Sequence, residues 1–155
     1  MKKLSNPLYF GIMCLLLGMV SGYVSGSGDE WYQNLQKPSF NPPSYVFAPV
    51  WSILYIMMGV ALGYLYNNKK KNKFLIKIFK IQLVLNLIWS PLFFYFHRID
   101  LALIDIIMLW LFLALFIAFC FKKRETKSAW LCVPYFLWVS FAVSLNYSLY
   151  RLNIS

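Results

Sequence analysis

Five long runs of apolar residues dominate the sequence, and short polar segments separate them. The runs carry almost no charge and cover residues 4–28, 38–68, 81–96, 101–121 and 128–150. A helix of roughly 20 apolar residues spans the hydrocarbon core of a bilayer. The third run is shorter, but Lys77 and Lys80 can lay their methylene stems along it and place their ammonium groups at the headgroups. The pattern predicts five membrane-spanning helices at residues 6–26, 45–66, 77–97, 101–121 and 129–150.

Composition and charge support a membrane protein. The chain of 155 residues is 61% hydrophobic and 20% aromatic, far more than the core of a soluble domain of this length needs. Its formal net charge of +10 does not indicate nucleic-acid binding, because the basic residues lie in the gaps between the apolar runs. We therefore predict an all-α integral membrane protein, a single domain over residues 1–155 built as a five-helix bundle, with the lipid bilayer and no nucleic acid as a partner.

The basic residues divide unevenly between the two ends of the predicted bundle. Of the 15 Lys and Arg residues, all but Lys37, Arg98 and Arg151 lie before the first span or near the connections that follow the second and fourth. By the positive-inside rule, the N-terminus is then cytoplasmic and the C-terminus is outside. The connection between the first and second spans becomes an outer loop rich in proline, with Pro38, Pro42, Pro43 and Pro49.

A cleaved signal peptide is the alternative interpretation of the first apolar run. Lys2 and Lys3 precede this run, and small residues follow near its end. Its uncharged stretch is longer than the roughly 7–15 residues of a signal-peptide core. We therefore count residues 6–26 as a span that stays in the membrane.

The sequence offers no familiar site for metal, cofactor or hydrolytic chemistry. The three cysteines lie in or beside apolar runs with no paired spacing, and the single histidine, His97, lies at the end of a span. There is no glycine-rich phosphate loop, no Ser-His-Asp set and no helical Glu/His metal pattern. We expect neither a metal site nor a cofactor.

Small residues indicate close helix packing in the first two spans. Gly18, Gly22 and Gly26 recur every four residues in the first span, and Gly59 and Gly63 repeat this spacing in the second. Such faces let two helix backbones approach closely. Packing within one bundle is the interpretation that we favour, and a seam between two copies of the chain, a homodimer, is the open alternative.

Polar residues inside the third span should face the bundle interior. Gln82, Asn86 and Ser90 lie at i, i+4 and i+8, so they form one polar stripe on an otherwise apolar helix. Pro91 has no N–H to donate to the carbonyl of Leu87. We therefore expect a kink or a free hydrogen-bond acceptor at this point.

Residues deep in the fourth and fifth spans should also face the interior. A carboxylate at the centre of a span, such as Asp105, costs about 2.5–3.5 kcal/mol, so it should find a donor or take up a proton. A structural hydrogen bond and a ligand or proton role are both open for it. In the fifth span Tyr135, Trp138 and Ala142 lie on one stripe, where the small Ala142 leaves room beside Trp138.

Five sequence segments carry a resemblance that covers almost the whole chain. They are WYQNLQKPSFNPP in the loop, APVWSILY at the second span, LNLIWSPLFF in the third, LALIDIIMLW in the fourth and PYFLWVSFAVSLN in the fifth. In this order they resemble the translocator protein family, also called tryptophan-rich sensory proteins or peripheral-type benzodiazepine receptors. For a chain with this resemblance and topology, we expect the plasma membrane of a bacterium as its location.

The resemblance implies a pocket under the outer loop that binds tetrapyrroles, such as protoporphyrin, and synthetic isoquinoline or benzodiazepine ligands. By matched position, its lining residues should be Tyr32, Pro42, Trp51, Asn86, Trp89, Phe93, Trp138 and Ala142. The loop prolines restrict the backbone and lower the entropy cost of folding the loop over the pocket as a lid. Trp31, Tyr32 and Phe40 then offer flat faces to a flat ligand.

A cholesterol-recognition pattern that animal members of the family carry also has a match here. Leu145, Tyr147 and Arg151 agree with it in the form L-x-Y-x-x-x-R. Such patterns are only hypotheses. An interfacial tyrosine and an arginine that reaches the headgroups explain these residues without a sterol, and we favour that interpretation.

Three functions agree with the residues and the resemblance. The first is a receptor, sensor or transporter that binds a porphyrin by stacking and enclosure. The second is an enzyme that degrades protoporphyrin by light-dependent oxidation, with Trp51 and Trp138 as redox-active catalytic residues. The third is a packing or chaperone partner whose pocket is incidental. We favour binding, because an aromatic lining is enough for an apolar pocket and no acid, base or metal group is evident.

Overall fold

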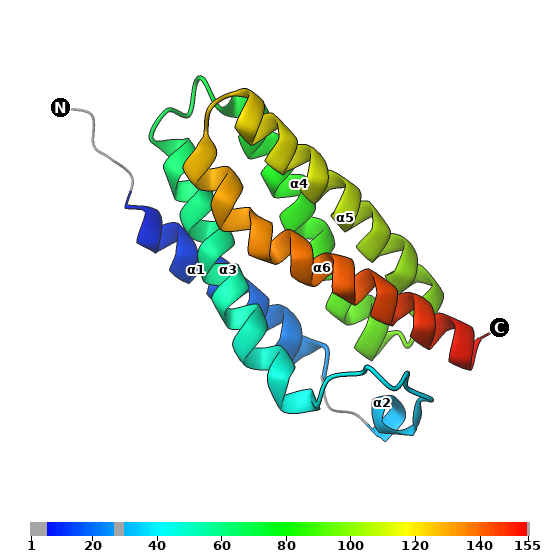
Figure 1. Cartoon of the computed structure of the whole chain (residues 1–155). Coiled ribbons are helices and arrows are strands. Elements are labelled where there is room, and N and C mark those ends of the chain that lie inside the picture. The colour runs from blue at the N-terminus through cyan, green and yellow to red at the C-terminus, as the bar shows by residue number, and fades with distance from the viewer. Residues whose placement is uncertain (1–5, 27–29, 155) are drawn as a thin grey trace.

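Five long helices run side by side, and a short helix lies in the loop between the first two (Figure 1). The computed structural model describes residues 6–26 and 30–154. Its helices are α1 (Pro7–Val24), α2 (Glu30–Asn34), α3 (Ser44–Tyr66), α4 (Lys73–Ser90), η1 (Pro91–Tyr95), α5 (Ile99–Lys122) and α6 (Thr126–Asn153). With η1 continuing α4, five helices are long and apolar enough to cross a bilayer. The predicted fold class, an all-α bundle of five transmembrane helices, is confirmed.

The observed helices differ from the predicted spans by a few residues at their ends. The third long helix begins at Lys73 rather than at residue 77, and the fifth ends at Asn153 rather than at residue 150. Both extensions contain polar residues, which a helix can carry beyond the hydrocarbon core but which a search for apolar runs leaves out. Pro49, which we counted among the loop prolines although the predicted span 45–66 contains it, lies inside α3 near its start. There it removes only one backbone hydrogen bond, to the carbonyl of Tyr45.

Glycines let α1 and α3 pack backbone against backbone. A Cβ atom on Gly59 would lie 2.2 Å from the carbonyl oxygen of Phe10, and one on Gly63 would lie 2.4 Å from Cα of Pro7. Gly11, which the glycine spacing did not single out, contributes its own Cα to the contact with Gly59. These two glycines of α3 therefore serve packing within the bundle, as predicted.

The glycines at the other end of α1 have different surroundings. A Cβ on Gly18 would lie 2.2 Å from the ring of Tyr55, so this glycine makes room for that ring. Among the described residues, no atom outside the neighbouring backbone of α1 lies within 4 Å of the Cβ position of Gly22. Gly26 follows α1 with φ of +64°, a left-handed conformation that glycine adopts at little cost. The described residues therefore make no close helix contact at the Cβ positions of Gly22 and Gly26.

The connections gather at two opposite ends of the bundle. At one end Lys71, between α3 and α4, pairs with Glu125, between α5 and α6, at 3.1 Å. At the other end the N–H of Gln36 donates to Oδ1 of Asn153 at 2.9 Å, and Nδ2 of Asn153 donates to the carbonyl of Gln36 at 3.0 Å. The loop between α1 and α3 is thus fastened to the end of α6. The assignment of the lysine-rich end to the cytoplasm stays a prediction.

Candidate functional site

A cavity of about 620 Å³ lies between the helices, beside the loop that joins α1 to α3. All five long helices contribute to its lining, together with α2 and η1. Pockets that bind small molecules in proteins typically have volumes of roughly 300–1,000 Å³. The cavity is therefore large enough for a ligand of the size of a drug or a cofactor.

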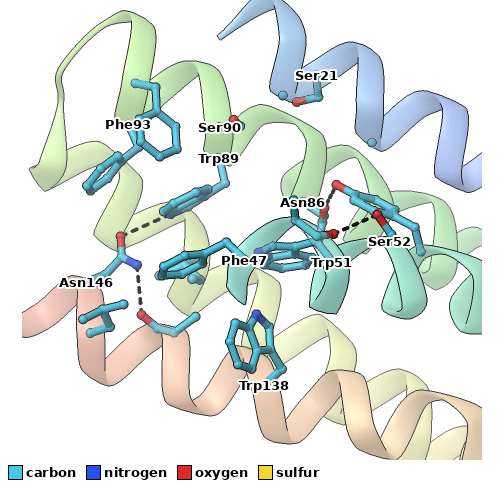
Figure 2. A pocket seen from close by; sticks show the side chains of 18 of the residues that line it. Ser21, Phe47, Trp51, Ser52, Asn86, Trp89, Ser90, Phe93, Trp138 and Asn146 are labelled. Atoms are coloured by element: carbon cyan, nitrogen blue, oxygen red, sulfur yellow. Dashed lines mark hydrogen bonds between the residues drawn. The ribbon is translucent and has the colours of Figure 1, made fainter. Parts of the chain in front are cut away.

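Aromatic rings from three helices make up much of the wall. Figure 2 shows Phe47 and Trp51 of α3, Trp89 of α4 and Trp138 of α6 gathered around one space. The rings of Phe47 and Trp138 meet edge to face with centroids 6.1 Å apart, and Trp89 stacks on Phe93 at 5.1 Å. Rings that pack on each other in this way are held in fixed orientations, so the wall offers preformed flat faces.

A chain of buried hydrogen bonds fixes the polar stripe of α4. The hydroxyl of Tyr55 donates to Oδ1 of Asn86. Nδ2 of Asn86 donates to the hydroxyl of Tyr135 at 2.6 Å, and that hydroxyl donates to Oε1 of Gln82 at 3.0 Å. Gln82 and Asn86 are buried, and Asn86 and Ser90 line the cavity, so the stripe faces the interior as predicted. Because both amide atoms of Asn86 have protein partners, its orientation is fixed before any ligand binds.

The free acceptor expected before Pro91 is present and has a partner. The hydroxyl of Ser21 on α1 donates to the carbonyl of Leu87 at 2.7 Å. Beyond Pro91 the helix continues as η1, in which the N–H of Phe96 donates to the carbonyl of Pro91 at 3.0 Å, a spacing of five residues. This wider turn is typical of functional sites, and here it carries the buried ring of Phe93 to the cavity.

Two tryptophans of the wall differ in how their indole N–H groups are used. Nε1 of Trp89 donates to Oδ1 of Asn146 at 3.2 Å, and Nδ2 of Asn146 donates to the carbonyl of Ala142 at 2.9 Å. Nε1 of Trp138 is buried and has no acceptor among the described residues. An unpaired buried donor costs about 1–3 kcal/mol, and an acceptor on a bound molecule can remove this cost.

The loop contributes one aromatic ring to the cavity and packs others elsewhere. Tyr32 lines the cavity, its hydroxyl donates to Oδ1 of Asn41 at 3.4 Å, and Nζ of Lys37 lies 4.7 Å from its ring centroid. Burial raises the pKa of the Tyr32 phenol above its usual range, so it stays a neutral hydroxyl. Trp31 instead stacks on His97 at 4.2 Å. The stacking of Trp31 on His97 therefore holds the described part of the loop against the connection between η1 and α5.

The structure brings most of the predicted lining residues together. Those that line the cavity are Tyr32, Trp51, Asn86, Trp89, Phe93, Trp138 and Ala142. Pro42 does not line it, and its carbonyl accepts a hydrogen bond from Nδ2 of Asn41 at 3.1 Å. Trp31 and Phe40 do not line it either, because their rings pack on His97 and Phe141. Pro42 and these two rings shape the loop around the cavity rather than its wall.

Several lining residues were not named from the sequence. They include Leu15, Met19 and Tyr23 of α1, Phe47 of α3 and Phe141 of α6. On α1 the small residues Gly18 and Gly22, with Ser21 beside them, indicated close helix packing and not a cavity wall. Asn146 and Leu149 of α6 also line the cavity, and their helical spacing from Ala142 and Trp138 indicates this side of the helix from the sequence.

The residues of the cholesterol-recognition pattern do not share one surface. Leu145 is buried and lines the cavity, whereas Tyr147 is exposed on the outside of α6 and is absent from the lining. Leu145 and Tyr147 are two residues apart on a helix, so their side chains point in nearly opposite directions. Arg151 follows Tyr147 by four residues and therefore lies on the same outer face. A sterol bound to the outer surface could therefore not contact all three.

Asp105 faces the bundle interior, as its position in the span required. The residue is buried, and its Oδ2 has no hydrogen-bond donor among the described residues. It is not among the residues that line the cavity. The donor expected for this oxygen is thus not found in the described part of the chain, and the geometry assigns Asp105 no role in the site.

The cavity reaches the outer surface of the bundle at residues of α1 and α3. Met19 and Tyr23 of α1 line it although 60% and 90% of their surfaces are exposed, and Ser44 and Ala48 of α3 are lining residues that are also exposed. These residues lie at the loop end of the two helices, beside the open space at Gly22. The cavity is therefore open to the surroundings of the bundle at the loop end of α1 and α3.

Comparisons with known proteins agree with this architecture. The model of the TspO/MBR family matches residues 10–151. The tryptophan-rich protein TspO of Chlorobaculum tepidum is 41% identical over 91% of this chain and 91% of its own length. The tryptophan-rich sensory protein of Cereibacter sphaeroides is 37% identical over 81% of this chain and 78% of its own length. The translocator protein of Ovis aries is 32% identical over 84% of this chain and 79% of its own length. The chain is an integral membrane protein that belongs to the TspO/MBR family.

Proposed function

We propose that this protein binds a porphyrin-type tetrapyrrole in the cavity, as a membrane receptor, sensor or transporter, without making or breaking a bond in the ligand. The observation that carries the proposal is the cavity of about 620 Å³, walled by fixed aromatic rings from α3, α4 and α6. A flat, apolar macrocycle gains most from such a wall, because stacking on rings adds to the burial of its faces. The family names support a sensing or translocating role.

Polar groups around the cavity also suit such a ligand. The buried N–H of Trp138 needs an acceptor, which a carbonyl or carboxylate on the edge of a tetrapyrrole can provide. Lys37 is held over the ring of Tyr32, which itself lines the cavity, so a cation lies near the loop side of the site. Carboxylate side chains of a porphyrin would be favoured at that side.

A fluorescence titration with ambient light excluded tests the proposal. Protoporphyrin is added to detergent-purified protein while the quenching of tryptophan fluorescence is followed. We expect saturable binding that Trp138→Phe weakens a few-fold, since phenylalanine keeps an aromatic face but loses the N–H and part of the stacking area. Trp110→Phe is the matched control, because Nε1 of Trp110 donates to Ser140 at 2.8 Å outside the cavity. Absence of saturation, or equal weakening in both variants, would contradict the proposal.

A further inference from the structure

A group of lysines lies on the outer surface of the bundle at the end away from the loop. Lys73, Lys77 and Lys80 are exposed and follow each other at i, i+4 and i+7 along one face of α4. Lys122 and Lys123 are at the end of the neighbouring helix α5. The two groups are joined through an aromatic contact, since Phe74 meets Phe119 at 5.2 Å and Nζ of Lys123 lies 5.7 Å from the centroid of Phe74. We call these five lysines the basic patch.

The basic patch is not neutralised by the described part of the chain. Glu125, the acidic residue at this end, already pairs with Lys71 at 3.1 Å, and Asp100 pairs with Arg98 at the opposite end. No ion pair with a patch lysine is found among the described residues. The first turn of a helix also favours negative rather than positive charge, so Lys73 at the start of α4 adds a further unfavourable charge to this surface. An external anion would therefore stabilise this surface.

The position of the patch indicates where that anion comes from. Lys77 and Lys80 lie one and two turns inside a helix that spans the membrane, and not in a connection. The same face of α4 continues into the exposed apolar side chains of Val84 and Ile88. A soluble acidic protein could not approach this face through the bilayer. A lipid can place its phosphate at the lysines and its acyl chains along Val84 and Ile88.

We propose that the basic patch binds the headgroup of an anionic phospholipid, with the acyl chains of that lipid lying against the outer face of α4. Lysines act on a phosphate as point charges, and each contributes roughly a fivefold gain in affinity for an anionic membrane surface. Three lysines on one face then favour an anionic lipid over a zwitterionic one on the order of a hundredfold. The site is separate from the cavity and does not depend on what the cavity binds.

Native mass spectrometry of the full chain in a neutral detergent tests the proposal, with phosphatidylglycerol or phosphatidylcholine of equal chain length as the probe. The patch variant is Lys73→Gln/Lys77→Gln/Lys80→Gln. The control is Lys69→Gln/Lys70→Gln/Lys127→Gln, which removes the same charge at the same end of the bundle but outside the patch. We expect wild type and control to bind phosphatidylglycerol tightly and the patch variant to bind it on the order of a hundredfold more weakly.

Single substitutions and a soluble phosphate define the lipid site more closely. Lys77→Gln alone should weaken binding about fivefold and Lys77→Arg should retain it, and thermal unfolding without lipid checks that every variant is folded. Equal losses in patch and control variants would overturn the proposal, because they would show only a general attraction to the basic end. Equal binding of both lipids would also overturn it. Displacement of the lipid by soluble glycerol phosphate would overturn it as well, since the site would then bind free phosphate and not a lipid.

Discussion

The hydroxyl of Ser21 donates a 2.7 Å hydrogen bond to the backbone carbonyl of Leu87, 66 residues later in the chain. That carbonyl is available because Pro91, four residues further on, has no N–H to donate to it. The hydrogen bond links α1 to α4 beside the cavity, where Ser21 is also a lining residue. It positions one wall of the site by pairing a backbone group that would otherwise be unsatisfied in the membrane.

Replacing this hydroxyl should reduce stability, and the reduction should depend on Pro91. We expect Ser21→Ala to cost about 0.6–1.7 kcal/mol in thermal or denaturant unfolding, the range of interhelical hydrogen bonds in membranes. In a Pro91→Ala background the new N–H can bond to Leu87, so the same change at Ser21 should cost less. Additive losses in the double-mutant cycle would show that the carbonyl does not need Ser21.

Two glycines with the same sequence pattern should respond in opposite ways to one added methyl group. Gly59→Ala should destabilise the protein by several kcal/mol, because its Cβ would lie 2.2 Å from the backbone of Phe10 and α1 and α3 would have to separate. Gly22→Ala should be neutral or slightly stabilising, because no described residue outside the neighbouring backbone lies within 4 Å of the added Cβ and alanine favours helix by roughly 0.5–1 kcal/mol. Thermal unfolding of the pair measures this difference, and similar losses in both would contradict the observed crossing of α1 and α3.

Removing the hydroxyl of Tyr135 should be costly. Tyr135→Phe leaves the amide of Asn86 and the carbonyl oxygen of Gln82 without their partner in a buried setting, so we expect a loss of about 1–3 kcal/mol in unfolding free energy. Tyr147→Phe is the matched control, since Tyr147 is exposed and should change stability by about 0.5 kcal/mol or less. Equal effects would mean that the buried chain of hydrogen bonds does not stabilise the bundle.

The attachment of the loop to α6 should govern how fast a ligand leaves. Asn153→Ala removes both hydrogen bonds to Gln36, so we expect faster dissociation of porphyrin in stopped-flow measurements with little change in thermal stability. Ser148→Ala serves as the control, because its hydroxyl bonds only to the carbonyl of Ser144 on the same helix. An unchanged dissociation rate in Asn153→Ala would show that the ligand leaves by another route, such as past the exposed lining residues of α1 and α3.

The sequence predicted what depends on local pattern. The length of apolar runs is a local property, and it led to five spans. The free carbonyl of Leu87 was also predictable, because it follows from the chemistry of Pro91 alone. The inward orientation of Gln82 and Asn86 followed from helical spacing and the cost of polar groups in lipid.

What the sequence did not predict depends on how helices cross. Gly22 and Gly59 have the same type of spacing, but only Gly59 lies where α1 and α3 touch. Ser21 could not be named as the partner of Leu87, because their contact depends on the tertiary arrangement. Pro42 matched a pocket position by motif, yet it is not among the residues that line the cavity.

If a tetrapyrrole binds in the cavity beside Trp138, a ring introduced there must compete with it for space. Ala142→Phe places a ring in the cavity, whereas Ile104→Phe places one on the outer surface of α5, where 60% of Ile104 is exposed. The affinity for protoporphyrin is measured for both variants and for wild type by fluorescence titration in the dark. We predict that Ala142→Phe lowers the affinity at least tenfold, about 1.4 kcal/mol, and that Ile104→Phe leaves it unchanged. Wild-type affinity in a folded Ala142→Phe variant would contradict the claim and place the porphyrin outside this cavity.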